Sequence, residues 1–196
     1  MKIKHIVIIC LIPLLMLSGC AWFEPKKEKS AEDLANEGMA AFAKENYAAA
    51  IESFEKLKDW YPFSKFAALA ELKIADAHYE LEAYEEAVFA YESFENLHPK
   101  NEAVSYVIYQ IGMCHFKRME TIDRDQTATQ KAIDVFNRLI TQLPGNTYAA
   151  SAKENIRKCK QNLAEHEFYV GLFYYKSKHY KAALERFDTV LSDYPD

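Results

Sequence analysis

The sequence predicts an all-α fold, a solenoid in which helix–turn–helix repeats follow one another along the chain. Apolar residues recur at helical spacing from Ala31 onward, and no stretch shows the sustained alternation of a β-strand. Glycine and proline number only 5 and 6 while 50% of the residues are hydrophobic, which favours packed helices over a turn-rich β-sandwich. The third and strongest observation is a sequence pattern that occurs four times.

Each copy of the pattern has an anchor residue, an alanine three residues later, an aromatic residue four residues further on, and a proline fifteen residues after the anchor. The small alanine lets a neighbouring helix approach closely, and the aromatic ring fills the space one turn on. The proline ends the helix because it lacks an N–H and clashes with the preceding turn. The copies run from Tyr47 to Pro62, Tyr84 to Pro99, Thr129 to Pro144 and Tyr180 to Pro195.

A partner helix is expected before each of these helices. A small residue lies twelve positions before three of the alanines, at Gly38, Ala75 and Gly171, and Gly112 takes this place in the third copy if eight residues are inserted near Met119–Gln126. The spacing resembles the tetratricopeptide repeat, although the unit is 37 residues long here and about 34 in that family. The predicted repeat domain, 31–196, holds repeats at 31–67, 68–104, 105–147 and 164–196, with an extra helix near 148–165.

The N-terminal segment, 1–19, has the features of a secretory signal. A short basic stretch precedes the apolar segment Ile6–Leu17, which is shorter than the roughly 20 residues of a membrane-spanning helix. Leu17-Ser18-Gly19-Cys20 resembles the bacterial lipobox, so we expect a lipid on Cys20 and a tether over 20–30. An uncleaved or ordinary signal with a chance cysteine is the alternative. Ala21, where an aspartate would retain a lipoprotein in the inner membrane, favours the outer membrane.

Charge and cysteine content exclude two classes of protein. Removal of the signal takes away two lysines and no acidic residue, so the formal net charge falls from −5 to −7. An acidic chain is a poor partner for nucleic acid, whose phosphates need clustered basic residues. Cleavage and lipidation leave Cys114 and Cys159, too few for a disulfide framework. A single disulfide bond between these two cysteines is the alternative, but two buried free thiols fit their helical surroundings better.

No motif in the sequence indicates catalysis, a metal or a cofactor. His166-Glu167 begins like the zinc-protease motif HExxH, but Val170 stands where the second histidine is required. A nucleophile elbow, a P-loop and a dinucleotide-binding glycine motif are absent from the sequence as well. We therefore expect a protein that is not an enzyme, with the covalent lipid on Cys20 as its only attached group.

Four segments of the sequence carry a further resemblance: Trp60-Tyr61-Pro62-Phe63, Val104–Tyr109, Asp123-Arg124-Asp125 and Leu163–Val170, the last running into Phe173-Tyr174-Tyr175. Together they resemble the BamD family of outer-membrane assembly lipoproteins. The resemblance implies a lipid-anchored scaffold on the periplasmic face of the outer membrane. By analogy, the chain would work with BamA and other assembly lipoproteins to fold and insert β-barrel proteins. The alternative is another periplasmic repeat scaffold, for envelope assembly or linked to peptidoglycan.

A row of aromatic residues is the candidate site for unfolded barrel-protein segments. In stacked helical pairs the first helix of each pair lines the concave face. With Gly38 numbered as position eight, position twelve points into that groove and is aromatic in all four repeats. Aromatic rings anchor peptides well because they bury much area at a small entropic cost. The candidates are Phe42, Tyr79, Phe116 and Tyr175, joined in repeat three by Tyr106, Tyr109 and Met113.

The contact with BamA is expected in the distal half. The resemblance implies that this end meets the last periplasmic domain of BamA. Asp123, Arg124 and Asp125 lie in the repeat-three insertion, where a loop is free to reach outward. Arg186 lies on the last helix between two packing positions and is expected to be exposed. Each of these four residues could equally be an ordinary solvated charge.

The last predicted helix carries more apolar residues than the preceding helix can cover. A terminal repeat needs a polar outer face, because each unit of a solenoid buries its apolar surface on its neighbours. The family carries about one more repeat than the sequence to Asp196 contains. We therefore expect partial exposure here, and either a partner or a continuation of the natural chain to cover the helix. The stripe contains Tyr180, Ala183, Leu184, Phe187, Val190 and Leu191.

Overall fold

The computed structural model describes residues 28–195, and the residues from 31 onward form one compact unit. The predicted signal 1–19, the lipidation site Cys20 and all but the last three residues of the tether lie outside the described residues. Between residues 28 and 195, no helix combines the length and apolar character needed to cross a membrane.

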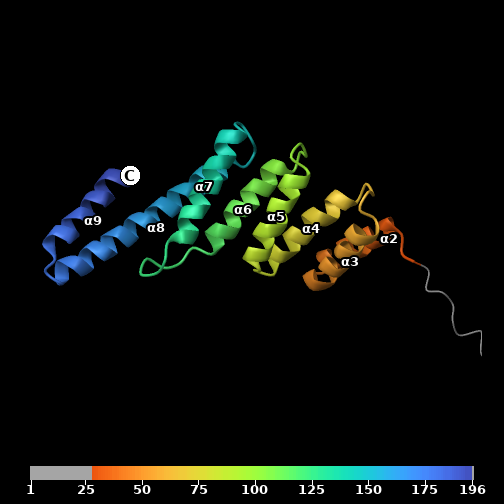
Figure 1. The fold of residues 1–196 in the computed structure, drawn as a ribbon, viewed down its shortest axis with the longest axis horizontal. Helices are drawn as coiled ribbons and strands as arrows, with labels where there is room; N and C mark the ends of the chain where they lie inside the picture. Colours follow the sequence, from red (N-terminus) through yellow and green to blue (C-terminus); the bar gives the residue numbers. More distant parts are fainter. Residues whose placement is uncertain (1–27, 196) are drawn as a thin grey trace, which may run out of the picture. The chain divides into compact units, whose positions relative to one another are not determined.

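Eight helices make up the described part of the chain, which has no strand (Figure 1). They form four consecutive pairs, and this confirms the predicted all-α solenoid. Short turns join the two helices within the first, second and fourth pairs, while a nine-residue loop, 118–126, joins those of the third. The pairs are α2 (Ala31–Ala43) with α3 (Tyr47–Trp60), α4 (Ala67–Glu80) with α5 (Tyr84–Leu97), α6 (Val104–Lys117) with α7 (Thr127–Gln142), and α8 (Ala149–Lys176) with α9 (Tyr180–Asp193).

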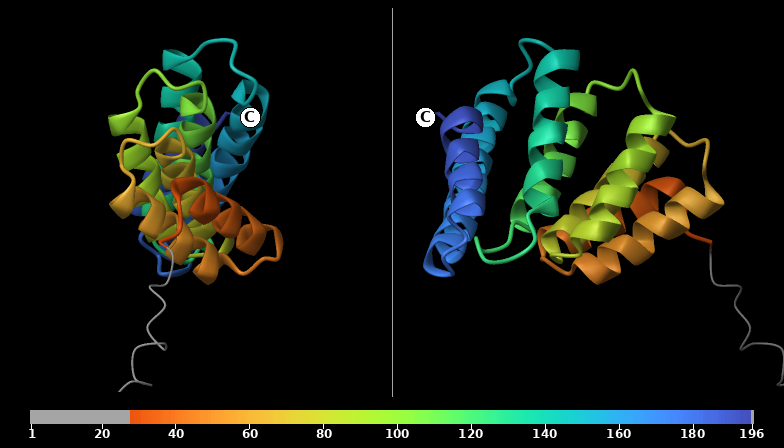
Figure 2. Two further views of the ribbon diagram at one scale, coloured as in Figure 1. Left: turned by 90° about the vertical axis from the view of Figure 1, so that its right-hand side faces the viewer. Right: turned by 60° about the vertical axis from the view of Figure 1, so that its left-hand side comes forward.

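Each helix packs on the helix before it and the helix after it in sequence (Figures 1 and 2). Beyond these neighbours, α6 also contacts α8. The buried residues accordingly form successive clusters along the solenoid rather than one central core. This is the expected packing of a repeat protein, in which stability comes from each unit and its contacts with its neighbours.

The predicted interlock between a small residue and an aromatic ring occurs inside the repeats. A Cβ atom added to Gly38 would lie 2.6 Å from the ring of Phe54, and one on Gly112 would lie 2.5 Å from the ring of Phe136. Both distances are too short for carbon atoms, so only glycine lets these rings pack against the first helix. The alanines of the pattern, from Ala50 to Ala183, are at most 2% exposed.

The tight turns share one backbone conformation. Glu45, Glu82 and Lys178 each follow the end of a first helix and have φ values of 58°, 58° and 62°. The next amide reaches back to a carbonyl five residues earlier, for example from Ala83 to His78. This is the left-handed C-terminal cap that usually employs glycine, so each of these side chains occupies a strained position.

The structure corrects the predicted organisation before repeat four. An extra helix near 148–165 and a separate first helix of repeat four were expected, but α8 runs without interruption from Ala149 to Lys176. The physical reason is local, because this segment contains no proline and only one glycine, Gly171. The second half of α8 still packs on α9 as a repeat would, since Gly171 faces the ring of Phe187.

The last helix is partly exposed, as predicted. Tyr180, Leu184 and Leu191 are 61%, 60% and 74% exposed, whereas Ala183 is buried. The two cysteines, Cys114 and Cys159, are buried free thiols, as their helical surroundings favoured. Burial raises the pKa of Cys114 to about 12 and that of Cys159 to about 11, which makes both thiols unreactive at neutral pH.

Candidate functional site

An aromatic residue near the end of the first helix marks every repeat, and in three repeats it closes the turn. The ring packs edge-on against the ring that begins the following helix, at centroid distances of 5.1, 5.6 and 5.8 Å. In the third repeat the loop replaces this turn, and the ring joins a core cluster instead. The pairs are Phe42 with Tyr47, Tyr79 with Tyr84 and Tyr175 with Tyr180, and the core residue is Phe116.

These position-twelve residues differ in how much of the side chain is exposed to a ligand. Tyr175 is 57% exposed, whereas Phe42, Tyr79 and Phe116 are half-buried. Burial, followed by the neighbouring Tyr84, raises the pKa of Tyr79 to about 12, so its hydroxyl stays protonated. The row therefore combines packing with a partly accessible surface, and its most accessible ring lies in the distal repeat.

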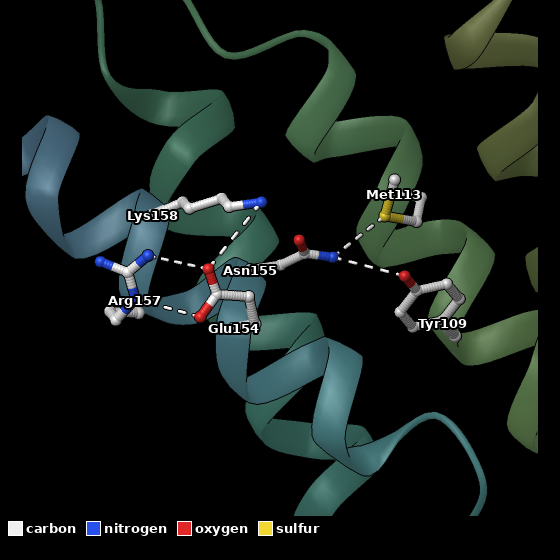
Figure 3. A network of polar contacts seen from close by, with 6 residues as sticks. All are labelled: Tyr109, Met113, Glu154, Asn155, Arg157 and Lys158. Carbon is white, nitrogen blue, oxygen red and sulfur yellow. Dashed lines mark hydrogen bonds and ion pairs between the residues drawn. The ribbon is translucent and has the colours of Figure 1, made fainter.

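The remaining groove candidates, in repeat three, form one cluster against the first half of α8. The ring of Tyr148 stacks on Tyr109 at 5.0 Å between centroids and lies 6.0 Å from Tyr106. The Asn155 amide is within 3.4 Å of the Tyr109 hydroxyl and 3.2 Å of the Met113 sulfur (Figure 3). Tyr109 and Met113 are thus brought together, but α8 covers one side of them.

A buried carboxylate joins repeats two and three. Asp76, 6% exposed, accepts hydrogen bonds from the hydroxyls of Tyr91 at 2.7 Å and Tyr106 at 2.9 Å. Lys73 donates to its other oxygen at 2.7 Å. Burial, the nearby Asp76 charge and hydrogen bonding raise the pKa values of both tyrosines. The hydroxyl of the groove candidate Tyr106 is therefore committed to holding two repeats together.

The repeat-three loop contradicts the expectation of a segment that reaches freely outward. The Asn162 amide donates to the Gln126 side chain at 2.6 Å, and His166 Nδ1 donates to the Ile122 carbonyl at 2.7 Å. Gln126 in turn donates to two carbonyls inside the loop. The loop is held against α8, because side chains about forty residues further along the chain satisfy its polar groups.

Three charged residues of this loop, Asp123, Arg124 and Asp125, are the predicted contact residues; all three are exposed, and the two aspartates stabilise the conformation of the loop. The hydrogen bond from the Thr121 hydroxyl lowers the pKa of Asp123, and hydrogen bonding to Thr127 lowers that of Asp125. The Asp125 carboxylate accepts from the Thr127 amide at 2.9 Å and so satisfies an amide at the start of α7. Arg124 has no ion-pair partner within residues 28–195, which leaves its guanidinium available to a partner.

Arg186 is partly exposed, as expected, but its guanidinium already has a partner. It binds both carboxylate oxygens of Glu167 on α8, at 2.8 and 3.1 Å, and 43% of its side chain is exposed. The pair raises the pKa of Arg186. Glu167 follows His166 directly, so consecutive residues of α8 hold the Arg186 side chain and the repeat-three loop. Both parts of the predicted contact surface are therefore attached to neighbouring residues of α8.

The residues that support these sites were not predicted from the sequence, although the sequence of repeat two contains a signal for one of them. The position of Asp76 is apolar in the other repeats, where Met39, Met113 and Leu172 stand. Tyr91 likewise stands where the other repeats have phenylalanine. Two polar exceptions in one repeat, at positions that are apolar in the other repeats, indicate a mutual hydrogen bond because a buried polar group needs a partner. Asn155, Asn162 and Glu167 gave no comparable signal.

The fold and these surfaces define the class: a helical-repeat scaffold of the tetratricopeptide kind. The chain belongs to the YfiO family of outer membrane lipoproteins, whose family model matches residues 27–196. Among residues 28–195, no three side chains are gathered that could hold a metal ion.

Related proteins support this family assignment, and a solved structure shows the same fold. Relatives named outer membrane protein assembly factor BamD occur in Rickettsia prowazekii, 31% identical over 99% of this chain and 78% of that protein, and in Neisseria meningitidis, 29% identical over 92% and 74%. The Caulobacter vibrioides relative is 28% identical over 89% of this chain and 59% of its own length. The tetratricopeptide domain of Arabidopsis OM64 shares the fold, with a TM-score of 0.51 at 17% identity over 65% of this chain and 94% of that chain.

Proposed function

We propose that this chain is a scaffold lipoprotein of the β-barrel assembly machinery, which binds BamA and segments of unfolded barrel proteins at the outer membrane. The observation that carries the proposal is family membership over residues 27–196, together with relatives whose names describe outer membrane protein assembly. Anchoring through a lipid on Cys20, on the periplasmic face, is part of the proposal.

Substrate binding is assigned to the position-twelve aromatic row. Tyr175 presents a ring that is 57% exposed, and Phe42, Tyr79 and Phe116 each keep part of a ring accessible. Barrel-protein segments that end in aromatic residues would find aromatic partners spaced one repeat apart. The Tyr106 side chain is held in a fixed position, since its hydroxyl donates a hydrogen bond to Asp76.

Binding of BamA is assigned to the surface formed by the repeat-three loop and α9. Arg124 is an exposed charge of this loop with no ion-pair partner in the described residues, and His166, which anchors the loop on α8, directly precedes Glu167, the partner of Arg186. A loop held in place loses little conformational entropy on binding, which favours a stable contact. Arg186 keeps donor capacity because a guanidinium has five N–H groups and Glu167 accepts through two hydrogen bonds.

The proposal is tested by purifying the full chain from detergent-solubilised membranes and identifying the proteins that accompany it. A barrel protein with periplasmic domains is the expected partner, and peptidoglycan-associated partners without one would overturn the assignment. Arg124→Glu should reduce recovery of the barrel protein without changing the thermal midpoint. Lys100→Glu, an equal charge change in the exposed loop between α5 and α6, is the control and should leave recovery unchanged.

Substrate binding is tested with a synthetic peptide from the aromatic-ended C-terminus of a barrel protein. Tyr175→Ala should weaken binding, since it removes the most exposed ring of the row. Phe63→Ala removes a fully exposed ring outside the row and serves as the matched control. Equal peptide affinity for both variants and the original chain would contradict the assignment of the row.

A further inference from the structure

A groove on α3, α4 and α5 lies outside the aromatic row and the distal surface. It has a volume of about 470 Å³, and the buried side chains of Ile74 and Phe94 contribute to its lining. Phe89 and Leu97, 73% and 66% exposed, also line it and lie eight residues apart on α5. These two side chains are therefore about 12 Å apart along the helix, the length of two helical turns.

The charged side chains that line the groove are mostly acidic. Four glutamates line it, whereas Lys58 is its only lysine or arginine. Glu71 is paired with His98 and Glu85 with Arg118. Glu55 and Glu86 have no basic side chain within ion-pair distance in the described part of the chain. An apolar surface next to uncompensated carboxylates disfavours anionic ligands and favours a ligand that is apolar and basic.

We use junction for the space between the second helices of two successive repeats; the groove lies at the junction of α3 and α5. At the next junction along the solenoid, side chains of the protein itself fill the equivalent space. Between α5 and α7, the guanidinium of Arg138 binds both carboxylate oxygens of Glu95. By the repeat spacing, Ser93 corresponds to Arg138 and Lys58 corresponds to Glu95, and both line the open groove. A hydroxymethyl group cannot reach across, and an ammonium group cannot accept a hydrogen bond, so no equivalent bridge forms.

The histidines of the two junctions show the same difference. His78 and His115 occupy one repeat position. His78 lines the open groove and is half-buried, whereas His115 is only 9% exposed. Burial lowers the pKa of His115, and nearby Lys131 and Arg118 add to this effect. One junction is therefore closed by the chain's own side chains, while its neighbour is left open.

We propose that the groove between α3 and α5 binds an arginine-bearing apolar segment of a partner protein, which supplies the guanidinium that Arg138 supplies at the next junction. The apolar side chains of the segment would contact Phe89 and Leu97, and its arginine would pair with Glu55 or Glu86. The inference does not rest on the proposed function, because none of the residues assigned to that function lines this groove.

The test uses the full chain in detergent and two short fluorescein-labelled peptides. Both carry leucines at i, i+3, i+4 and i+7, and the other positions hold arginine in one peptide and glutamate in the other. Fluorescence anisotropy should show binding of the arginine peptide at least about tenfold tighter than the glutamate peptide. Binding of the arginine peptide no tighter than that of the glutamate peptide would overturn the proposal.

The decisive variant is Lys58→Glu combined with Ser93→Arg, which recreates the Arg138–Glu95 pair inside the groove. It should weaken binding of the arginine peptide about tenfold, because the chain then supplies its own guanidinium. Lys153→Glu combined with Ser151→Arg makes the same exchanges at exposed positions of α8 and should leave affinity unchanged. Unchanged affinity in the groove variant, or an equal loss in the α8 control, would overturn the assignment.

A single substitution covers the case in which the groove variant does not fold. Phe89→Ser removes an exposed ring, so circular dichroism should show an unchanged thermal midpoint. Binding of the arginine peptide should nevertheless weaken several-fold, because the ring is expected to contact the leucines. Full binding by a folded Phe89→Ser variant would contradict the proposed occupant.

Discussion

Removal of the Asp76 carboxylate should lower the stability of the chain, because this group joins repeats two and three. Asp76 receives three hydrogen bonds of 2.7 to 2.9 Å, and its donor Tyr91 is fully buried. Asp76→Met would leave the Tyr91 hydroxyl unpaired and Lys73 without its carboxylate. Loss of one partner of a buried charge pair costs about 3–5 kcal/mol, and this corresponds to roughly 10 °C in Tm for a domain of this size.

The matched double variant tests the physical reason rather than the cost alone. Asp76→Met with Tyr91→Phe installs the residue types that repeat three has at these positions, Met113 and Phe136. With both polar partners gone, the penalty for a buried unpaired hydroxyl disappears. The double variant should therefore be more stable than Asp76→Met alone by about 1–3 kcal/mol.

Urea denaturation followed by circular dichroism gives the stability of Asp76→Met, Tyr91→Phe and the double variant. The reasoning fails if Asp76→Met costs less than about 1 kcal/mol, which is the scale of one ordinary hydrogen bond. It also fails if the costs of the two substitutions simply add, since additivity would mean that the two side chains do not interact.

Three further predictions follow from the turns, the tyrosines and the distal ion pair. Glu82→Gly should stabilise the chain by about 0.5–1 kcal/mol, because glycine adopts the φ of 58° without strain, and an unchanged or lower Tm would contradict this. Folding raises the pKa values of Tyr79 and Tyr91, so the contribution of these hydroxyls to stability is complete below pH 10. It is lost as the pH rises from there through the folded pKa, which is about 12 for Tyr79. The urea midpoint should therefore fall less steeply from pH 9 to 11 in Tyr79→Phe than in the original chain. Arg186→Glu should cost about 1 kcal/mol, because it faces Glu167 with a like charge, and exchanging both charges should recover most of the loss; no recovery in the exchanged variant would show that the pair is not the cause.

The repeats could be predicted because their signals are local. Proline and the small-residue positions determine where helices end and which face is buried, and both are visible within one unit. The continuous helix α8 had a local signal too, in the absence of any proline between Ala149 and Lys176. The repeat spacing suggested a boundary near residue 165, where the chain has no residue that would end a helix.

For the aromatic row, the sequence predicted only which face of each helix carries the rings. Spacing placed Phe42, Tyr79 and Tyr175 on one side of their helices, but whether a ring is open depends on the side chain it meets. Each meets an aromatic residue at the start of the next helix, five residues further on, so part of its surface is used in the turn. That contact follows from the tight turn geometry, which the helical period does not describe.

The distal surface depends on contacts over longer distances in sequence. Glu167 and Arg186 are 19 residues apart, and His166 and Ile122 are 44 residues apart. Neither pair could be inferred from periodicity, because the register of α8 against the preceding loop depends on where that uninterrupted helix ends. Once α8 is continuous, its residues 166 and 167 hold the loop on one side and α9 on the other. A change at His166 should therefore alter the loop, and a change at Glu167 should alter the position of Arg186, although neither residue needs to touch BamA.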